Sequence, residues 1–212
     1  MEHKIILASG SPRRKELLES LGLKFDIFPA TNPEVPKGDT PTEIALNLAI
    51  QKANEVYDKH RNENALVIAA DTIVVCDDKI LGKPKDEEDA GRMLKMLSYR
   101  SHQVITGICI KDESTEIHST DTTNVSFYKI TDSEITKYLK IIDKNTGKPE
   151  WIDKAGGYAI QGYAGTHFVR SIEGDYNNVV GLPISKVYQQ LKDIRNCSAA
   201  SLLPVTSKQR CS

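Results

Sequence analysis

The residues best suited to chemistry begin near the N-terminus, in a strand–turn–helix segment. The apolar run Ile5–Ala8 predicts a buried strand, and the next turn leads to Pro12, a residue favoured at the first helical position. Ser11 is the expected N-cap. Arg13 and Arg14 then fall in the first helical turn, where the helix dipole favours negative charge. Two guanidiniums beside free N–H groups predict a phosphate-type anion site, with a solvated surface pair as the alternative.

Two acids and two lysines could complete such a site. Asp71 interrupts an apolar run at residues 66–75, and a buried carboxylate is costly unless it is paired, hydrogen-bonded or metal-bound; capping of a loop or bulge is the alternative. Glu34, in a polar loop, is by itself typical of a solvated acid. Lys52 borders an apolar helix face, where it could snorkel, and Lys83 lies in a Gly-Lys-Pro turn. Only the combination indicates chemistry, namely a phosphate turn, two carboxylates for a divalent cation and two lysines for phosphate charge.

A glycine-rich segment, Asp153–Gly162, offers a close approach to a ligand. Within it, Gln161 can both donate and accept hydrogen bonds, which suits the edge of a nucleotide base. The alternative is a buried amide that ties a loop together. The surrounding residues 144–165 are rich in glycine and polar side chains, as functional loops often are.

The elements that must position these residues alternate between strands and helices. Beyond the first strand, apolar patterning predicts strands at residues 23–29, 66–75, 103–110, 124–128 and 169–172, and a strand end at Val179–Val180. Capping boxes and helical spacing predict helices at residues 41–59, 87–97 and 131–142, and a last one from Pro183. This alternation predicts an α/β domain with a mixed sheet.

Composition restricts the class of protein. The chain has 212 residues, enough for one domain with a sizeable core, and its 28 Lys and Arg against 29 Asp and Glu argue against a nucleic-acid-binding protein. No apolar run approaches the roughly 18–20 residues that cross a membrane, and no signal-peptide pattern precedes the first strand. Four cysteines without metal-ligand spacing suggest reduced thiols of a cytoplasmic protein, without disulfides or zinc: Cys76, Cys109, Cys197 and Cys211.

Taken together, these segments resemble the Maf family of nucleoside triphosphate pyrophosphatases, also described as septum-formation proteins. The resemblance rests on six motifs that follow one another between residues 4 and 194: Ala8–Arg14, Ala70–Val74, Leu81–Pro84, His102–Gly107, Asp153–Gly162 and Asn178–Pro183. It implies a fold related to that of inosine triphosphate pyrophosphatases, with a long mixed sheet flanked by helices and two lobes around a cleft. It also implies a single domain at residues 1–195, which leaves residues 196–212 as a loose tail.

The resemblance further implies hydrolysis of a nucleoside triphosphate between the α and β phosphates, giving the monophosphate and pyrophosphate. By similarity, Asp71 activates the water and, with Glu34, holds a divalent cation, Mg²⁺ with Mn²⁺ as the alternative. Arg13, Thr72 and Gln161 fall on positions that set base preference. The other matching polar positions of the family cleft are Ser9, Arg14, Lys52 and Lys83.

The sequence Gly-Tyr-Ala-Ile-Gln-Gly at residues 157–162 is similar to the branch of the family that acts on dTTP and UTP. Two alternatives remain: a housecleaning enzyme for modified pyrimidine nucleotides, and a non-catalytic, nucleotide-binding regulator of cell division. The resemblance also implies a homodimer. One departure concerns residues 147–153, where Lys148 replaces the Glu of a Gly-Glu-Pro-x-Asp pattern and two residues are added. Either Glu150 substitutes for that Glu or the loop is rearranged, which bears on base preference.

Overall fold

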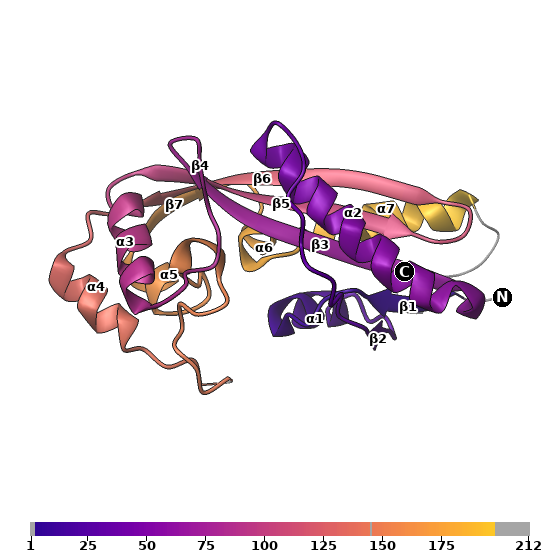
Figure 1. Cartoon of the computed structure of the whole chain (residues 1–212), viewed down its shortest axis with the longest axis horizontal. Coiled ribbons are helices and arrows are strands. Elements are labelled where there is room, and N and C mark those ends of the chain that lie inside the picture. Colours follow the sequence, from indigo (N-terminus) through magenta and orange to yellow (C-terminus); the bar gives the residue numbers. More distant parts are fainter. Residues whose placement is uncertain (1–2, 145, 198–212) are drawn as a thin grey trace, which may run out of the picture.

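The computed structural model describes residues 3–144 and 146–197 and contains a seven-stranded mixed sheet flanked by helices (Figure 1). The strand order is β2-β1-β3-β5-β6-β7, and β4 pairs with β3 outside this path. β1 is parallel to β2 and β3, whereas the other pairs are antiparallel. The strands are β1 (Lys4–Leu7), β2 (Asp26–Ile27), β3 (Ala65–Cys76), β4 (Lys79–Leu81), β5 (Ser101–Lys111), β6 (Glu116–Phe127) and β7 (Val169–Glu173).

The two faces of the sheet are covered by different helices (Figure 1). α2 (Pro41–His60) covers one face and packs on alternate residues of β3, including Val67 and Ala69. Its close approach to β5 requires Gly107, because a Cβ there would lie 2.3 Å from the carbonyl oxygen of Ala45. On the other face, α7 (Ile184–Cys197) packs on the intervening residues of β3. Neighbouring β3 side chains therefore point into different environments.

A second hydrophobic core is rich in aromatic residues and lies toward the end of the sheet away from α7. Phe127, Tyr158 and Phe168 form its centre, and the rings of Phe127 and Tyr158 meet edge to face with centroids 4.9 Å apart. Because β3, β5 and β6 contribute residues at both ends, one sheet joins two lobes. The helices of this second lobe are α3 (Glu87–Leu97), α4 (Asp132–Leu139) and α5 (Tyr163–His167).

Helix starts agree closely with the sequence predictions. α1 (Pro12–Glu19) begins after Ser11, whose hydroxyl accepts the N–H of Arg14. The two capping boxes are present at α2 and α4, where Thr40 and Thr131 each exchange hydrogen bonds with a glutamate three residues later. These features are local in sequence, and so they could be predicted without tertiary information.

Several predicted strands were wrong in extent or type. The predicted strand at 23–29 shortens to the two residues of β2, and the predicted strand at 124–128 is the end of the 12-residue β6, which stops at Phe127. The first half of β6 is polar and partly exposed, so it carries no apolar alternation. β4 was not predicted. Val179 and Val180 belong to a helix, α6 (Tyr176–Val180), which Asp175 caps by accepting the N–H of Asn177.

In the part of the chain that the structure describes, no helix is both long and apolar enough to span a membrane. Cys76 and Cys109 are buried free thiols. The expected tail at 196–212 lies almost entirely outside the described residues.

Candidate active site

The predicted site residues gather where one edge of β3 is uncovered. β1 pairs with β3 as far as Ile68, and β4 pairs with the same strand from Val74 onward. Among the described residues, no strand covers this edge between the two pairings. Asp71 and Thr72 lie in this interval, with Asp71 only 8% exposed. Because side chains alternate along a strand, Asp71 faces α2 and Thr72 faces α1 and α6.

Arg14 is the hub of the group on the Thr72 side. Its Nε donates to the carbonyl oxygen of Gly181 at 2.7 Å, and its two terminal nitrogens donate to Ser9 Oγ at 3.2 Å and Thr72 Oγ1 at 3.0 Å. Gly181 ends α6 with a φ of +128°, a conformation that favours glycine. The guanidinium is thus oriented by three acceptors from three separate segments. The alternative of a solvated arginine pair is wrong for Arg14.

Burial also changes the electrostatics of both arginines. Desolvation lowers the pKa of Arg14, and the negative charge of Asp71 counteracts that effect. Desolvation likewise lowers the pKa of Arg13, while Asp143, Glu16 and Asp153 oppose the shift. Arg13 donates from Nε to the carbonyl oxygen of Val180 at 3.3 Å. Two partly desolvated cations therefore sit at the N-terminus of α1, an arrangement that would bind phosphate oxygens strongly.

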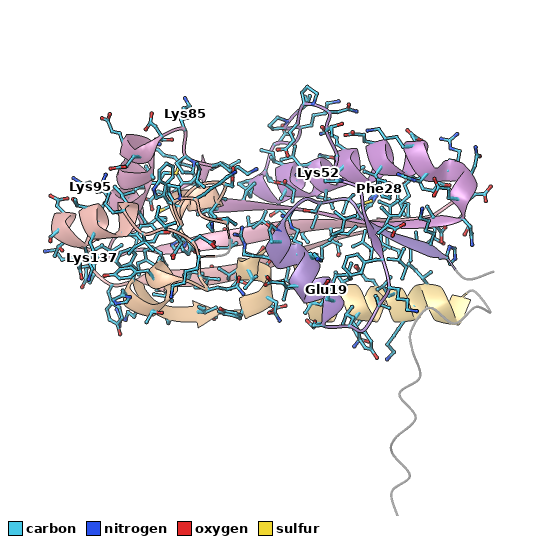
Figure 2. The ribbon with its side chains drawn as sticks, turned by 90° about the horizontal axis from the view of Figure 1, so that it is seen from below. Glu19, Phe28, Lys52, Lys85, Lys95 and Lys137 are labelled. Carbon is cyan, nitrogen blue, oxygen red and sulfur yellow. The ribbon has the colours of Figure 1, made fainter. Side chains whose placement is uncertain are left out.

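On the other side of β3, Lys52 joins two carboxylates. Lys52, labelled in Figure 2, comes from α2, and its ammonium donates a hydrogen bond to Asp71 Oδ1. The same ammonium lies 2.9 Å from Glu34 Oε1. Asp71 sits in an uninterrupted ladder with β5, so the alternative of a carboxylate capping a bulge is wrong. The alternative that Lys52 only snorkels past an apolar face is therefore wrong, because two carboxylates hold its ammonium.

Glu34 and Asp71 are the residues that could hold a divalent cation. Both carboxylates contact the ammonium of Lys52, which lies between Glu34 Oε1 and Asp71 Oδ1. Oxygen donors from carboxylates are what Mg²⁺ and Mn²⁺ prefer. For Glu34, burial raises the pKa, but the hydrogen bond from Lys52 and the charges of Lys52, Lys83 and Arg14 lower it further than burial raises it. Glu34 is therefore an ionised ligand candidate at neutral pH.

Two predicted residues stand apart from these groups. Lys83 is exposed and acts on Glu34 only through its charge. Gln161 is exposed in the turn before α5, and it makes no hydrogen bond with the described residues. The alternative of Gln161 as a buried tie within its loop is therefore wrong. The structure leaves its amide available to a ligand.

Sequence reasoning did not single out the polar residues behind Thr72. Thr106 Oγ1 lies 2.9 Å from Thr72 Oγ1 and also donates to the carbonyl oxygen of Asn178 at 3.4 Å. The buried amide of Asn178 donates to Val104 O and Thr123 Oγ1, each at 2.9 Å. This network fixes α6 against β5. It therefore also fixes the carbonyl groups of Val180 and Gly181, which accept hydrogen bonds from Arg13 and Arg14. The signal available in the sequence was the Asn-Val-Val-Gly-Leu-Pro motif at residues 178–183.

Comparison with known proteins assigns the family. A sequence model of the family described as "Maf-like protein" matches residues 4–194. This chain belongs to the Maf-like proteins. A relative from Agathobacter rectalis named dTTP/UTP pyrophosphatase is 45% identical over 207 residues, covering 90% of this chain and 97% of its own length. A relative from Koribacter versatilis with the same name is 48% identical over 189 residues, covering 89% and 93%.

The Maf-like chain also resembles a solved structure in its fold. The Ham1 protein of Staphylococcus aureus superposes with a TM-score of 0.54 at 14% sequence identity, covering 90% of this chain and 99% of its own. At that identity the likeness concerns the fold alone. It agrees with the long mixed sheet flanked by helices that the sequence predicted.

Proposed function

We propose that this Maf-like protein is a dTTP/UTP pyrophosphatase, which hydrolyses the nucleoside triphosphate between the α and β phosphates. The observation that carries the proposal is the placement of two charged groups on either side of one uncovered strand edge. One group, around Arg14, suits a phosphate chain, and the other, Lys52 with Asp71 and Glu34, suits water activation. The names of the relatives at 45% and 48% identity support the reaction and the pyrimidine substrates.

Binding of the triphosphate follows from the cationic side of the site. Arg13 and Arg14 lie in the first turn of α1, where the positive end of the helix dipole and the two guanidiniums attract a polyphosphate. Lys83 adds an exposed ammonium whose charge acts on Glu34. Because Arg14 is already oriented by Ser9, Thr72 and Gly181, little ordering is needed when substrate binds.

Hydrolysis requires a water positioned in line with the breaking bond. Asp71 accepts one proton from that water as its oxygen bonds to phosphorus, and the bridging P–O bond breaks to release pyrophosphate and the monophosphate. Lys52 orients the carboxylate through its hydrogen bond. Glu34 and Asp71 would together hold a divalent cation, Mg²⁺ or Mn²⁺, which supplies acidification of a bound water and neutralisation of phosphate charge.

Pyrophosphate release from a panel of nucleoside triphosphates with Mg²⁺ tests this function. We expect release from dTTP and UTP that stops with EDTA and is lost in Asp71→Asn. Release chiefly from modified pyrimidine nucleotides would support the same reaction but indicate a housecleaning enzyme that removes such nucleotides. Binding of nucleotide without any release would instead favour a non-catalytic regulator of cell division.

Three further features of the proposal concern organisation. We expect residues 1–195 to act as one catalytic domain, the protein to form a homodimer, and the enzyme to work in the cytoplasm without a nucleic-acid or membrane partner. Sedimentation equilibrium of the whole chain would measure the oligomeric state. A monomer that hydrolyses dTTP normally would remove the dimer from the proposal without affecting the chemistry.

A further inference from the structure

The altered loop at residues 147–153 contains a buried acid that the proposed mechanism does not use. Glu150 is 7% exposed, and its backbone N–H donates to the carbonyl oxygen of Ile141 at 2.8 Å. The next residue, Trp151, anchors the loop by donating from Nε1 to Leu139 O at 3.1 Å. A carboxylate taken out of water in this way must gain interactions that offset the loss of hydration.

The partner of this carboxylate is the turn that leads into α5. Glu150 Oε2 accepts the backbone N–H of Tyr163 at 3.3 Å. Gly162 allows the approach, because a Cβ at that position would lie 2.3 Å from both the carboxyl carbon and Oε1. The φ of Gly162 is −107°, so the requirement for glycine here is steric rather than conformational. Glu150 and Gly162 fit together as a matched pair.

The other oxygen of the carboxylate lies beside a second buried polar group. Burial raises the pKa of Tyr138, and the charge of Glu150 and a side-chain hydrogen bond with it raise the pKa further. Glu150 and Tyr138 thus form a buried polar pair.

Gln161 immediately precedes this anchored turn. It is exposed and makes no hydrogen bond of its own within the described part of the chain, so only the backbone sets its position. We propose that Glu150 is a positioning residue for substrate selection: its carboxylate fixes the Gly162–Tyr163 backbone and thereby holds Gln161 toward the base of the nucleotide. The inference rests on the proposed function, and it makes Glu150 the substitute for the glutamate missing at Lys148.

The test compares Glu150→Gln with a matched buried acid elsewhere. Asp112 is 6% exposed and accepts the backbone N–H groups of Ser114 and Thr115, each at 2.7 Å, in the turn between β5 and β6. Asp112→Asn therefore removes an equivalent charge from an equivalent turn. Both variants should lose some thermal stability, which a structural role alone would explain. Only Glu150→Gln should change the choice of nucleotide.

We expect Glu150→Gln to lower kcat/KM for dTTP roughly tenfold, the size of one charged hydrogen bond, through KM rather than kcat. Activity on a purine triphosphate should stay unchanged, so the pyrimidine preference falls by the same factor. Gly162→Ala, which disturbs the same contact from the other partner, should act in the same direction.

A double-mutant cycle with Gln161→Ala shows whether Glu150 acts through Gln161. In the Gln161→Ala background, Glu150→Gln should cause no further loss of pyrimidine preference, because the group that it positions is already absent. Additive effects, or unchanged preference in Glu150→Gln, would overturn the inference. A wild-type protein without pyrophosphate release would instead overturn the proposed function itself, so the two failures are distinguishable.

Discussion

The two lobes hold their functional side chains in different ways. In the first lobe, Arg14 and Lys52 are each fixed by direct hydrogen bonds to other side chains or to carbonyls of distant segments. In the second lobe, the side chain of Gln161 makes no hydrogen bond with the described residues, and the buried Glu150 accepts the backbone N–H of Tyr163. Charge stabilisation during reaction needs groups that are oriented beforehand, whereas discrimination between bases can be set by the position of one amide.

Removing the acid of the first lobe should have the largest effect. We expect Asp71→Asn to lower kcat for dTTP at least ~100-fold, the low end for loss of a general base. Asp89→Asn, at a half-buried acid of α3 that is ion-paired with Arg92, serves as the control and should leave kcat unchanged. Initial rates of pyrophosphate release measure both variants. Near-normal turnover in Asp71→Asn would exclude its role as base.

The orientation of the first-lobe guanidinium can be tested by Arg14→Lys. An ammonium keeps the charge but cannot reach Ser9, Thr72 and Gly181 together, so we expect a loss of about 2–3 kcal/mol, or roughly 30- to 150-fold in kcat/KM. Arg61→Lys, in an exposed ion pair with Asp58, is the matched control. If Arg14→Lys were as active as the control, charge alone would suffice at this position.

The second lobe should show a distinct dependence of stability on pH. Burial lowers the pKa of His102 to about 4, below its ordinary value near 6.5. Between these values the unfolded chain binds the proton and the folded chain does not, so stability is lost as pH falls from about 6.5 toward 4. From pH 7 to pH 5 we expect this residue to cost about 2 kcal/mol in the free energy of unfolding.

Urea unfolding of wild type and His102→Gln at the two pH values measures that dependence. His102 Nε2 lies 2.7 Å from the hydroxyl of Tyr158, a contact that a glutamine amide can replace. The variant should therefore lose the His102 contribution to the pH dependence while remaining folded. An identical slope in both proteins would show that this histidine titrates normally.

The smallest expected effect comes from the exposed amide of the second lobe. Gln161→Ala should reduce the preference for dTTP over a purine triphosphate roughly tenfold, the cost of one base-reading hydrogen bond, with little change in kcat. Gln51→Ala, on α2, is a control for loss of a surface amide, because its partners are the backbone groups of Val35. A large fall in kcat for Gln161→Ala would contradict the separation of roles between the lobes.

Local sequence signals predicted much of the fold because their causes are local. The Ser11 cap and the Thr40 and Thr131 capping boxes satisfy helix N–H groups with neighbours in the chain, and all three are present. The predictions were wrong for elements whose type, helix or strand, depends on contacts with residues distant in sequence. The polar half of β6 is a strand because it pairs with β5. Val179–Val180 is helical because the side chain of Asn178 bonds to β5 and β6 and so fixes α6.

For the site, the residue types can be read from the sequence: adjacent arginines follow a helix cap, and an acid lies inside an apolar strand. Their partners follow from the fold. Alternation along β3 sends Asp71 and Thr72 to opposite faces, so one meets Lys52 of α2 and the other meets Arg14 of α1. Arg14 and Gly181 are 167 residues apart in sequence, and a contact over that separation exists only because the whole sheet brings α1 and α6 together.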